Sequence, residues 1–123
     1  MHPIALMVPV PELEAGNAWY QRAFPYAELI SLPESDFRVL WLGDFLIEVV
    51  SSDEKVSNGM SGTICYWKVG DLSVAIDHFR TLGSSIHRGP MQIEGGMGMC
   101  QVTDPFGNLI GLRGEYRMEN DSG

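Results

Sequence analysis

The chain has 123 residues, 45% of them hydrophobic, and a net charge of −8 from 8 basic and 16 acidic residues. This length accommodates one domain with a substantial core, while no apolar run reaches the ~20 residues of a membrane span. The acidic balance argues against a nucleic-acid partner, because phosphates demand a basic surface, and instead fits solubility or a cationic ligand. The N-terminus lacks a signal pattern, and Cys65 and Cys100 lack metal-ligand spacing, so we expect a cytoplasmic protein with free thiols.

The first half of the chain predicts a strand, a helix and three further strands. Residues 5–10 form an apolar strand, and residues 11–24 follow as a helix with an early proline and an acidic first turn, although Gly16 weakens that helix. The dipeptide Gly43-Asp44 is typical of a two-residue hairpin. The strands that complete this half are expected at residues 27–32, 37–42 and 45–50.

The second half repeats this order after a polar, turn-rich linker at residues 51–62. It predicts a strand at residues 63–69 and a helix at residues 71–83 that ends at a glycine cap. Three short strands and a polar tail are expected to follow, at residues 84–89, 96–102, 108–113 and 114–123.

The two halves can be aligned residue by residue. Glu12-Leu13 and Asp71-Leu72 open the two helices at a spacing of 71 − 12 = 59, and GDFLIEV aligns with the end of DPFGNLIGL at a spacing of 111 − 48 = 63. One βαβββ unit leaves a sheet face uncovered, so two copies are expected to complete a curved sheet together. The sequence therefore predicts an α+β fold of two βαβββ modules, with a curved mixed sheet and helices on its outer face. We expect one domain over residues 1–123, with modules at 4–50 and 63–113.

Several motifs in this order resemble the vicinal oxygen chelate superfamily. They are PVPELEAGNAWYQRAF, VGDLSVAIDHFRTLG, IHRGP and above all DPFGNLIGL, and the resemblance runs from about Ile4 to Arg113. The superfamily comprises glyoxalases, extradiol dioxygenases, fosfomycin-modifying enzymes and bleomycin-resistance proteins. The resemblance implies the glyoxalase/bleomycin-resistance fold and a homodimer with grooves shared between chains. It also implies a divalent metal in the cup of the sheet, held by the first and last strand of each module.

The positions that match the family's metal ligands are occupied by Ala5, Glu48, Ile64 and Gly111. Only Glu48 can coordinate an ion, whereas a catalytic site generally needs about three protein ligands. The histidines are not expected to supply a shifted set. Strand alternation turns His2 away from the cup, and helix placement puts His78 on the wrong side of the sheet. His87 lies on a predicted strand, where we expect an exposed or hydrogen-bonded histidine. We therefore expect a metal-ligand-depleted member of the fold with no metal and no cofactor.

Strand alternation indicates which side chains line the cup. The predicted lining is apolar, with Glu48 and Gln101 as its few polar groups, and consists of Met7, Val39, Trp41, Leu46, Glu48, Tyr66, Met97, Met99, Gln101 and Leu109. Such a surface suits a small molecule with a flat apolar part and one or two hydrogen-bonding groups. The alternative is that these side chains simply fill the cup, as in many small barrels.

Glu48 is the single candidate catalytic residue, and three roles stay open for it. A carboxylate among apolar neighbours needs a cation, hydrogen-bond donors or a proton. Lys68 or Arg113 could supply an ion pair, a ligand amine could be anchored there, or Glu48 could act as a general base with Tyr66 as the partner acid.

Two functions follow from this interpretation. The first is metal-free binding or sequestration of a small, partly aromatic molecule, with a cationic one favoured by the acidic balance, as in antibiotic-sequestering relatives of the bleomycin-resistance type. The second is a glyoxalase-like lyase, isomerase or dioxygenase-type enzyme with a non-standard or absent metal site. Neither requires a membrane or a nucleic-acid partner.

Overall fold

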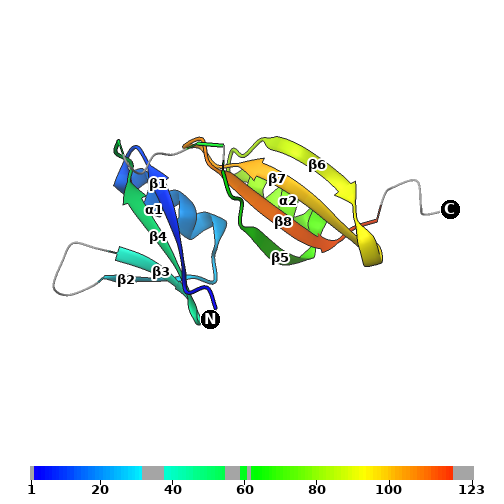
Figure 1. Cartoon of the computed structure of the whole chain (residues 1–123), viewed down its shortest axis with the longest axis horizontal. Coiled ribbons are helices and arrows are strands. Elements are labelled where there is room, and N and C mark those ends of the chain that lie inside the picture. Colours follow the sequence, from blue (N-terminus) through cyan, green and yellow to red (C-terminus); the bar gives the residue numbers. More distant parts are fainter. Residues whose placement is uncertain (1, 32–37, 55–58, 61, 118–123) are drawn as a thin grey trace. The chain divides into compact units, whose positions relative to one another are not determined.

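The computed structural model describes residues 2–31, 38–54, 59–60 and 62–117. The chain divides into two compact units, residues 1–58 and 59–123, each with one sheet and one long helix (Figure 1). Parts of the predicted linker and tail, at 55–58, 61 and 118–123, lie outside the described residues. The domain boundaries expected from the sequence stay predictions.

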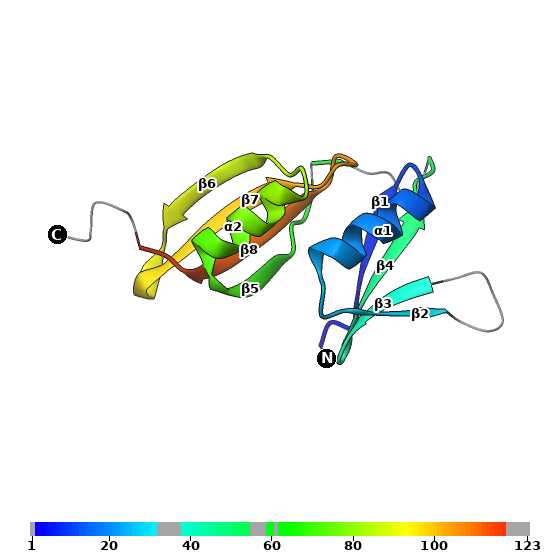
Figure 2. The same cartoon turned by 180° about the vertical axis from the view of Figure 1, so that it is seen from behind.

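The first unit is a four-stranded sheet with one helix. Its strand order is β1-β4-β3-β2, in which β1 runs parallel to β4 and the other pairs are antiparallel. Figure 2 shows α1 in front of this sheet, whereas in Figure 1 it lies behind, so one sheet face carries no helix. The elements are β1 (Ala5–Val10), α1 (Leu13–Ala23), β2 (Glu28–Ser31), β3 (Arg38–Leu42) and β4 (Phe45–Ser51).

Close packing of α1 on this sheet explains why a glycine interrupts the helix. A Cβ atom added to Gly16 would lie 2.7 Å from Cγ2 of Val10 and 2.9 Å from Cγ1 of Val49. Both valines belong to the buried core, together with Ile47 and Leu40 on the same sheet. Glycine costs about 1 kcal/mol of helix propensity relative to alanine, and here it permits the helix to approach β1 and β4.

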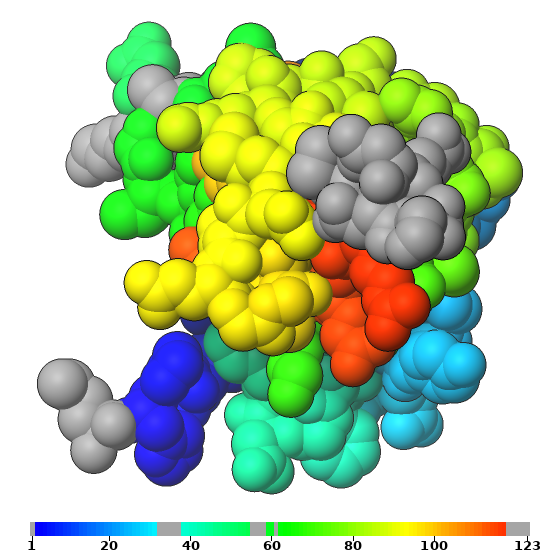
Figure 3. Space-filling view, turned by 90° about the vertical axis from the view of Figure 1, so that its right-hand side faces the viewer, coloured from blue at the N-terminus to red at the C-terminus, as the bar shows by residue number. Residues whose placement is uncertain are grey.

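The second unit repeats the arrangement with the order β5-β8-β7-β6. Again the first and last strands pair in parallel and the others are antiparallel. β6 is one of the two edge strands, and its residues together with the segment after it, in yellow-green and yellow, cover much of the surface seen in Figure 3. The elements are β5 (Tyr66–Asp71), α2 (Leu72–Thr81), β6 (Ile86–Gln92), the short 3₁₀ helix η1 (Glu94–Gly96), β7 (Met97–Thr103) and β8 (Leu109–Glu115).

Helix α2 begins and ends where the sequence predicts. The Asp71 carboxylate accepts a hydrogen bond from the Val74 backbone N–H at 3.1 Å, which caps the N-terminus. At the other end Gly83 has φ +88°, and the N–H groups of Gly83 and Ser84 donate to the carbonyls of Arg80 and Phe79. These two hydrogen bonds together form the Schellman motif, which places a residue with positive φ just after the helix.

The predicted α+β fold of two βαβββ modules is confirmed, as two four-stranded sheets each bearing one helix. Several strand boundaries differ from expectation, and β6 runs from Ile86 to Gln92 where residues 84–89 are predicted. β5 starts at Tyr66, three residues later than predicted, although the Cys65 carbonyl already accepts a bond from the Gly111 N–H. β8 continues to Glu115, because Gly98 and Met97 on β7 still pair with its last residues. No helix in the described part of the chain is long and apolar enough to cross a membrane.

Candidate ligand-binding faces

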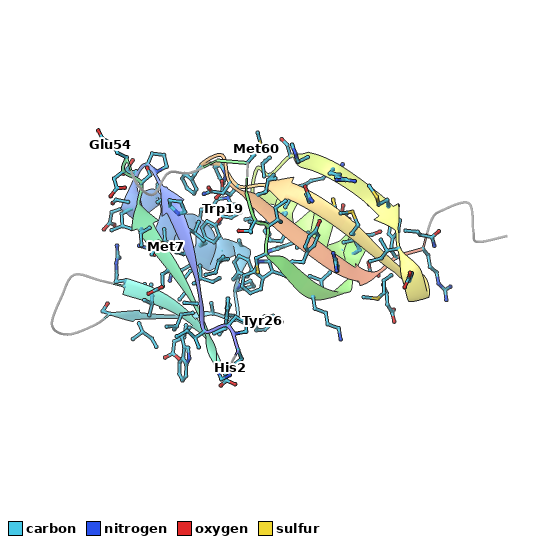
Figure 4. The ribbon with its side chains drawn as sticks, in the orientation of Figure 1. His2, Met7, Trp19, Tyr26, Glu54 and Met60 are labelled. Carbon is cyan, nitrogen blue, oxygen red and sulfur yellow. The ribbon has the colours of Figure 1, made fainter. Side chains whose placement is uncertain are left out.

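Each sheet has one face that packs under its helix and one that does not, and we call the second the helix-free face. Alternation along the strands assigns residues to the two faces. On β1, Val8 and Val10 are buried towards α1 while Ala5 and Met7 are exposed on the helix-free face. Figure 4 marks Met7 on β1 and Trp19, a buried residue, on α1. The predicted lining residues can therefore be located unit by unit.

The helix-free face of the second unit centres on Tyr66. Tyr66, Gly111 and Gln101 are register partners across β5, β8 and β7 and so form one row across the sheet. The Nε2 of Gln101 donates a hydrogen bond to the Tyr66 hydroxyl at 2.7 Å. The guanidinium carbon of Arg113 lies 4.2 Å from the centroid of the Tyr66 ring, which is a cation–π contact. We call Tyr66, Gln101, Gly111 and Arg113 the Tyr66 cluster.

The ring of Tyr66 packs against Gly111, where a side chain would exclude it. A Cβ atom at position 111 would lie 2.6 Å from Cδ1 of Tyr66 and 2.9 Å from the Cys65 carbonyl oxygen, distances that Cβ atoms essentially never show. The aromatic ring thus covers the bare backbone of β8. Gln101 is 7% exposed, so its bond to Tyr66 is made in a largely dry place. The row is packed and hydrogen-bonded, and holds the ring in one position.

The residues do not fit the metal that the fold resemblance implies. Ala5, Ile64 and Gly111 carry no donor atom, Ile64 precedes the first residue of β5, and the ring of Tyr66 covers Gly111. Among the described residues, no three His, Cys, Asp or Glu side chains lie close enough together to hold an ion. Glu48 alone of the four positions offers a ligating side chain, so these residues do not fit the ion.

The helix-free face of the first unit is apolar around Glu48. Met7 is the register partner of Glu48, and Leu46 is the partner of both Ala5 and Trp41. The side chains of Met7 and Trp41 are 52% and 44% exposed, and the side chain of Glu48 between them is half-buried. The other two predicted lining residues of this unit are Val39, which is buried, and Leu46, which is half-buried.

Glu48 makes no hydrogen bond or ion pair among the described residues of its own unit. The cation on the same sheet, Arg38, donates from Nη2 to Glu14 of α1 at 2.8 Å. The predicted ion pair of Glu48 with Lys68 or Arg113 would join the two units and stays a prediction.

The DPFGN segment builds the turn between β7 and β8. The buried Asp104 carboxylate accepts 2.8 Å bonds from the backbone N–H groups of Phe106 and Asn108, and a 2.9 Å bond from the Asn108 side-chain amide. Gly107 has φ +93°, a value that favours glycine. The motif that best suggests the fold is therefore a structural turn, and Asp104 is fully engaged within it.

Neither Cys65 nor Cys100 is suited to act as a nucleophile. Burial raises the pKa of the Cys65 thiol. It also raises the pKa of the Cys100 thiol, and the nearby Arg80 charge and a backbone hydrogen bond with Gln101 only partly oppose it. A higher thiol pKa leaves less of the reactive thiolate at neutral pH. The chemistry available on the described faces is therefore that of Tyr66, Gln101, Arg113 and Glu48.

Comparison with solved structures confirms the predicted resemblance at the level of the fold. An integron cassette protein from the mobile metagenome of V. Pseudocholerae is 20% identical, with a TM-score of 0.74 over 95% of this chain and 96% of that one. A glyoxalase/bleomycin resistance protein/dioxygenase family enzyme from Burkholderia phytofirmans is 15% identical, with a TM-score of 0.72 over 91% and 97%. Lactoylglutathione lyase from Agrobacterium tumefaciens is 15% identical, with a TM-score of 0.67 over 92% of both chains. No protein-family model and no curated protein matches the sequence.

The structure puts the predicted second-unit lining residues of β7 on the helix-free face; that they line a ligand site stays a prediction. Met97, Met99 and Gln101 alternate with Gly98, Cys100 and Val102, the last two of which are among the most buried side chains. The stacking of Arg113 on Tyr66 was missed, although one signal was available. In parallel pairing, an aromatic residue that falls opposite a glycine can lie across it, and Tyr66 is opposite Gly111.

Proposed function

We propose that this protein binds a small, partly aromatic molecule on its helix-free sheet faces, without a metal. The proposal rests mainly on two large apolar side chains on the helix-free face of the first unit, Trp41 at 44% and Met7 at 52% exposure. Single exposed apolar residues are ordinary. Here they come from two strands that both pair with β4, on either side of a half-buried carboxylate. Apolar surface beside one polar group is the usual composition of a ligand site.

The chemistry of this face defines the ligand. Trp41 offers a flat ring for stacking, and Met7 offers a flexible, polarisable chain that adapts to irregular shapes. Glu48 has acceptor atoms free of partners within its unit, so it would anchor a hydroxyl, an amide or an amine of the ligand. An amine is the choice that the net charge of −8 also supports.

The fold supports this proposal without deciding between binding and catalysis. One structural neighbour is described as a glyoxalase/bleomycin resistance protein/dioxygenase family enzyme, and another as a lactoylglutathione lyase. A glyoxalase-like lyase, isomerase or dioxygenase-type enzyme is the second candidate, with Glu48 of the first unit as the candidate catalytic residue. The Gln101–Tyr66 hydrogen bond favours it, because it orients a phenolic hydroxyl. A homodimer in the cytoplasm completes the proposal.

Replacing Trp41 by alanine is expected to weaken binding of an aromatic ligand at least tenfold, or ~1.4 kcal/mol. The free energy of unfolding should fall by only ~1 kcal/mol, because nearly half of the side chain is already in contact with water. The ligand would come from a thermal-shift screen of cationic antibiotics, glutathione conjugates and aromatic acids, since a compound that binds only the native state raises Tm.

Tyr26 supplies the matched control, because it is an aromatic residue of the same unit that is 95% exposed and lies outside the strands. Tyr26→Ala should leave the affinity for the same ligand unchanged. Equal affinities of Trp41→Ala and the unaltered protein would place the ligand away from this face and contradict the proposal.

A further inference from the structure

We infer that the helix-free face of the second unit recognises a carboxylate, and that the ligand of this face is an aromatic carboxylic acid. The inference rests on the proposed function, because it specifies the chemical class of the ligand for one of the two helix-free faces. The charge of this ligand differs from that of the amine suggested for the face around Glu48. The acidic balance of the whole chain favours a cation, whereas the local groups around Tyr66 favour an anion.

Arg113 is a cation held in place with its donors unused. Its guanidinium lies over the Tyr66 ring at 4.2 Å from the centroid. The side chain is exposed, and it makes no ion pair or hydrogen bond among the described residues. A guanidinium that stacks by its flat face keeps the N–H groups at its edge for a ligand, in the planar fork that matches a carboxylate. The stacking also removes part of the entropy cost of fixing a long side chain.

The Tyr66 hydroxyl is a second donor beside it. Because this oxygen accepts the bond from Gln101 Nε2, its own hydrogen is available to a further acceptor. Gly111 fixes the ring on which both groups depend. Arg113 and Tyr66 therefore present a cation and a neutral donor on the same side of the sheet, the combination that one carboxylate group satisfies.

The neighbouring charges reinforce this choice. Lys68 is the register partner of Arg113, is exposed, and shares the strand parity of Tyr66. Arg88 on β6 is the register partner of Gln101. Three of the chain's 8 basic residues therefore lie on or beside this row of a protein with 16 acidic ones. The acidic residue with the parity of Arg113 is Glu115, two residues further along β8.

The apolar residues around the cluster fit the body of such a ligand. Leu109 precedes Gly111 by two residues, Met97 shares its parity, and both are half-buried. Met99, the register partner of Arg113, is buried beneath this surface. Phosphate groups favour helix N-termini. The N-terminus of α2 belongs to the opposite layer and is capped by Asp71. A planar carboxylate on a flat apolar body is the ligand that these residues match.

The test compares three probes of the same shape, benzoate, benzamide and benzylamine, by NMR titration of the full chain. We expect benzoate to bind at least tenfold more tightly than either of the others. Arg113→Met keeps an apolar chain over the ring but removes the donors, and should abolish that preference. Tyr66→Phe keeps the ring and should lower benzoate affinity about threefold. Arg22→Met removes an exposed arginine from α1 and should change nothing.

Each contrary result has one meaning. If benzamide binds as tightly as benzoate, the carboxylate inference is wrong while the proposed function stands. If benzylamine binds most tightly and Glu48→Gln abolishes its binding, the ligand is a cation and the inference is also wrong. If none of the three probes binds to the folded protein, the inference and the proposed binding of aromatic molecules fail together.

Discussion

Replacing Gly111 by alanine is expected to lower the free energy of unfolding by ~2–3 kcal/mol, the range of an overpacked core. The new Cβ would lie 2.6 Å from the Tyr66 ring and 2.9 Å from the Cys65 carbonyl oxygen. The ring cannot move freely, because Gln101 donates a hydrogen bond to its hydroxyl and the Arg113 guanidinium lies over the ring. The Cys65 carbonyl belongs to the backbone and can shift even less than the ring. Chemical denaturation at equilibrium measures the effect.

Gly70 provides the matched control within the same sheet. It lies in β5, it does not have a positive φ, and an added Cβ there would meet nothing within 4 Å. Gly70→Ala should therefore leave stability within ~0.5 kcal/mol. In a Tyr66→Ala background, the cost of Gly111→Ala should fall to about half, because the ring is gone while the carbonyl remains. If Gly111→Ala costs no more than Gly70→Ala, the Tyr66 ring does not cover this glycine.

Replacing Asp104 by alanine is expected to cost ~3 kcal/mol or more of unfolding free energy. Three hydrogen bonds to this carboxylate are lost at once, and each bond to a charged group contributes ~1.5–3 kcal/mol before relaxation. Two of the lost donors are backbone N–H groups of a turn in which Asp104 itself is 4% exposed. The pairing of β7 with β8 should also become less stable. Faster amide hydrogen exchange at the Thr103–Leu109 pair would measure that loss.

Asp44 tests whether this cost is specific to the DPFGN turn. It occupies the hairpin turn of the first unit, where it is exposed, so Asp44→Ala should change stability by no more than ~0.5 kcal/mol. Asp104→Asn keeps an acceptor for the backbone donors and should cost less than Asp104→Ala. Equal losses for Asp44→Ala and Asp104→Ala would show that the carboxylate bonds do not hold the turn.

The sequence predicted the order of elements well because each signal was local. The hairpin dipeptide, the glycine cap of α2 and the DPFGN turn act within a few residues, and all appear where expected. Strand alternation also assigned Met97, Met99 and Gln101 to the helix-free face, since a period of two leaves only two choices. Local rules therefore sufficed for the fold and for which side chains share a face.

Interactions between distant strands were harder to predict. The contact of Tyr66 with Gly111 depends on the register of parallel strands that are far apart in sequence. Gly16 was counted against its helix because propensity describes an isolated helix, whereas the valines beneath it decide the outcome. The same holds for Arg113, whose role follows from the ring below it. What was missed was the packing of one side chain on another.

The contacts of Tyr66 explain why a glycine, Gly111, occupies the LIGL strand. At the position where the superfamily resemblance implies a metal-ligating residue, the second unit has a bare backbone covered by an aromatic ring, with an amide and a guanidinium bound to that ring. Where the resemblance implies an ion, this face offers organic side chains. Recognition by hydrogen bonds and stacking is the chemistry that such a cluster supplies.

Metal content tests this account most directly. Protein purified without an affinity tag, and without chelators, would be analysed for bound elements by mass spectrometry after desalting. The account predicts that no divalent metal approaches one equivalent per chain, before or after incubation with Ni, Zn, Mn or Fe salts. One tightly held equivalent of any of these metals, lost when Glu48 is replaced by Gln, would contradict it.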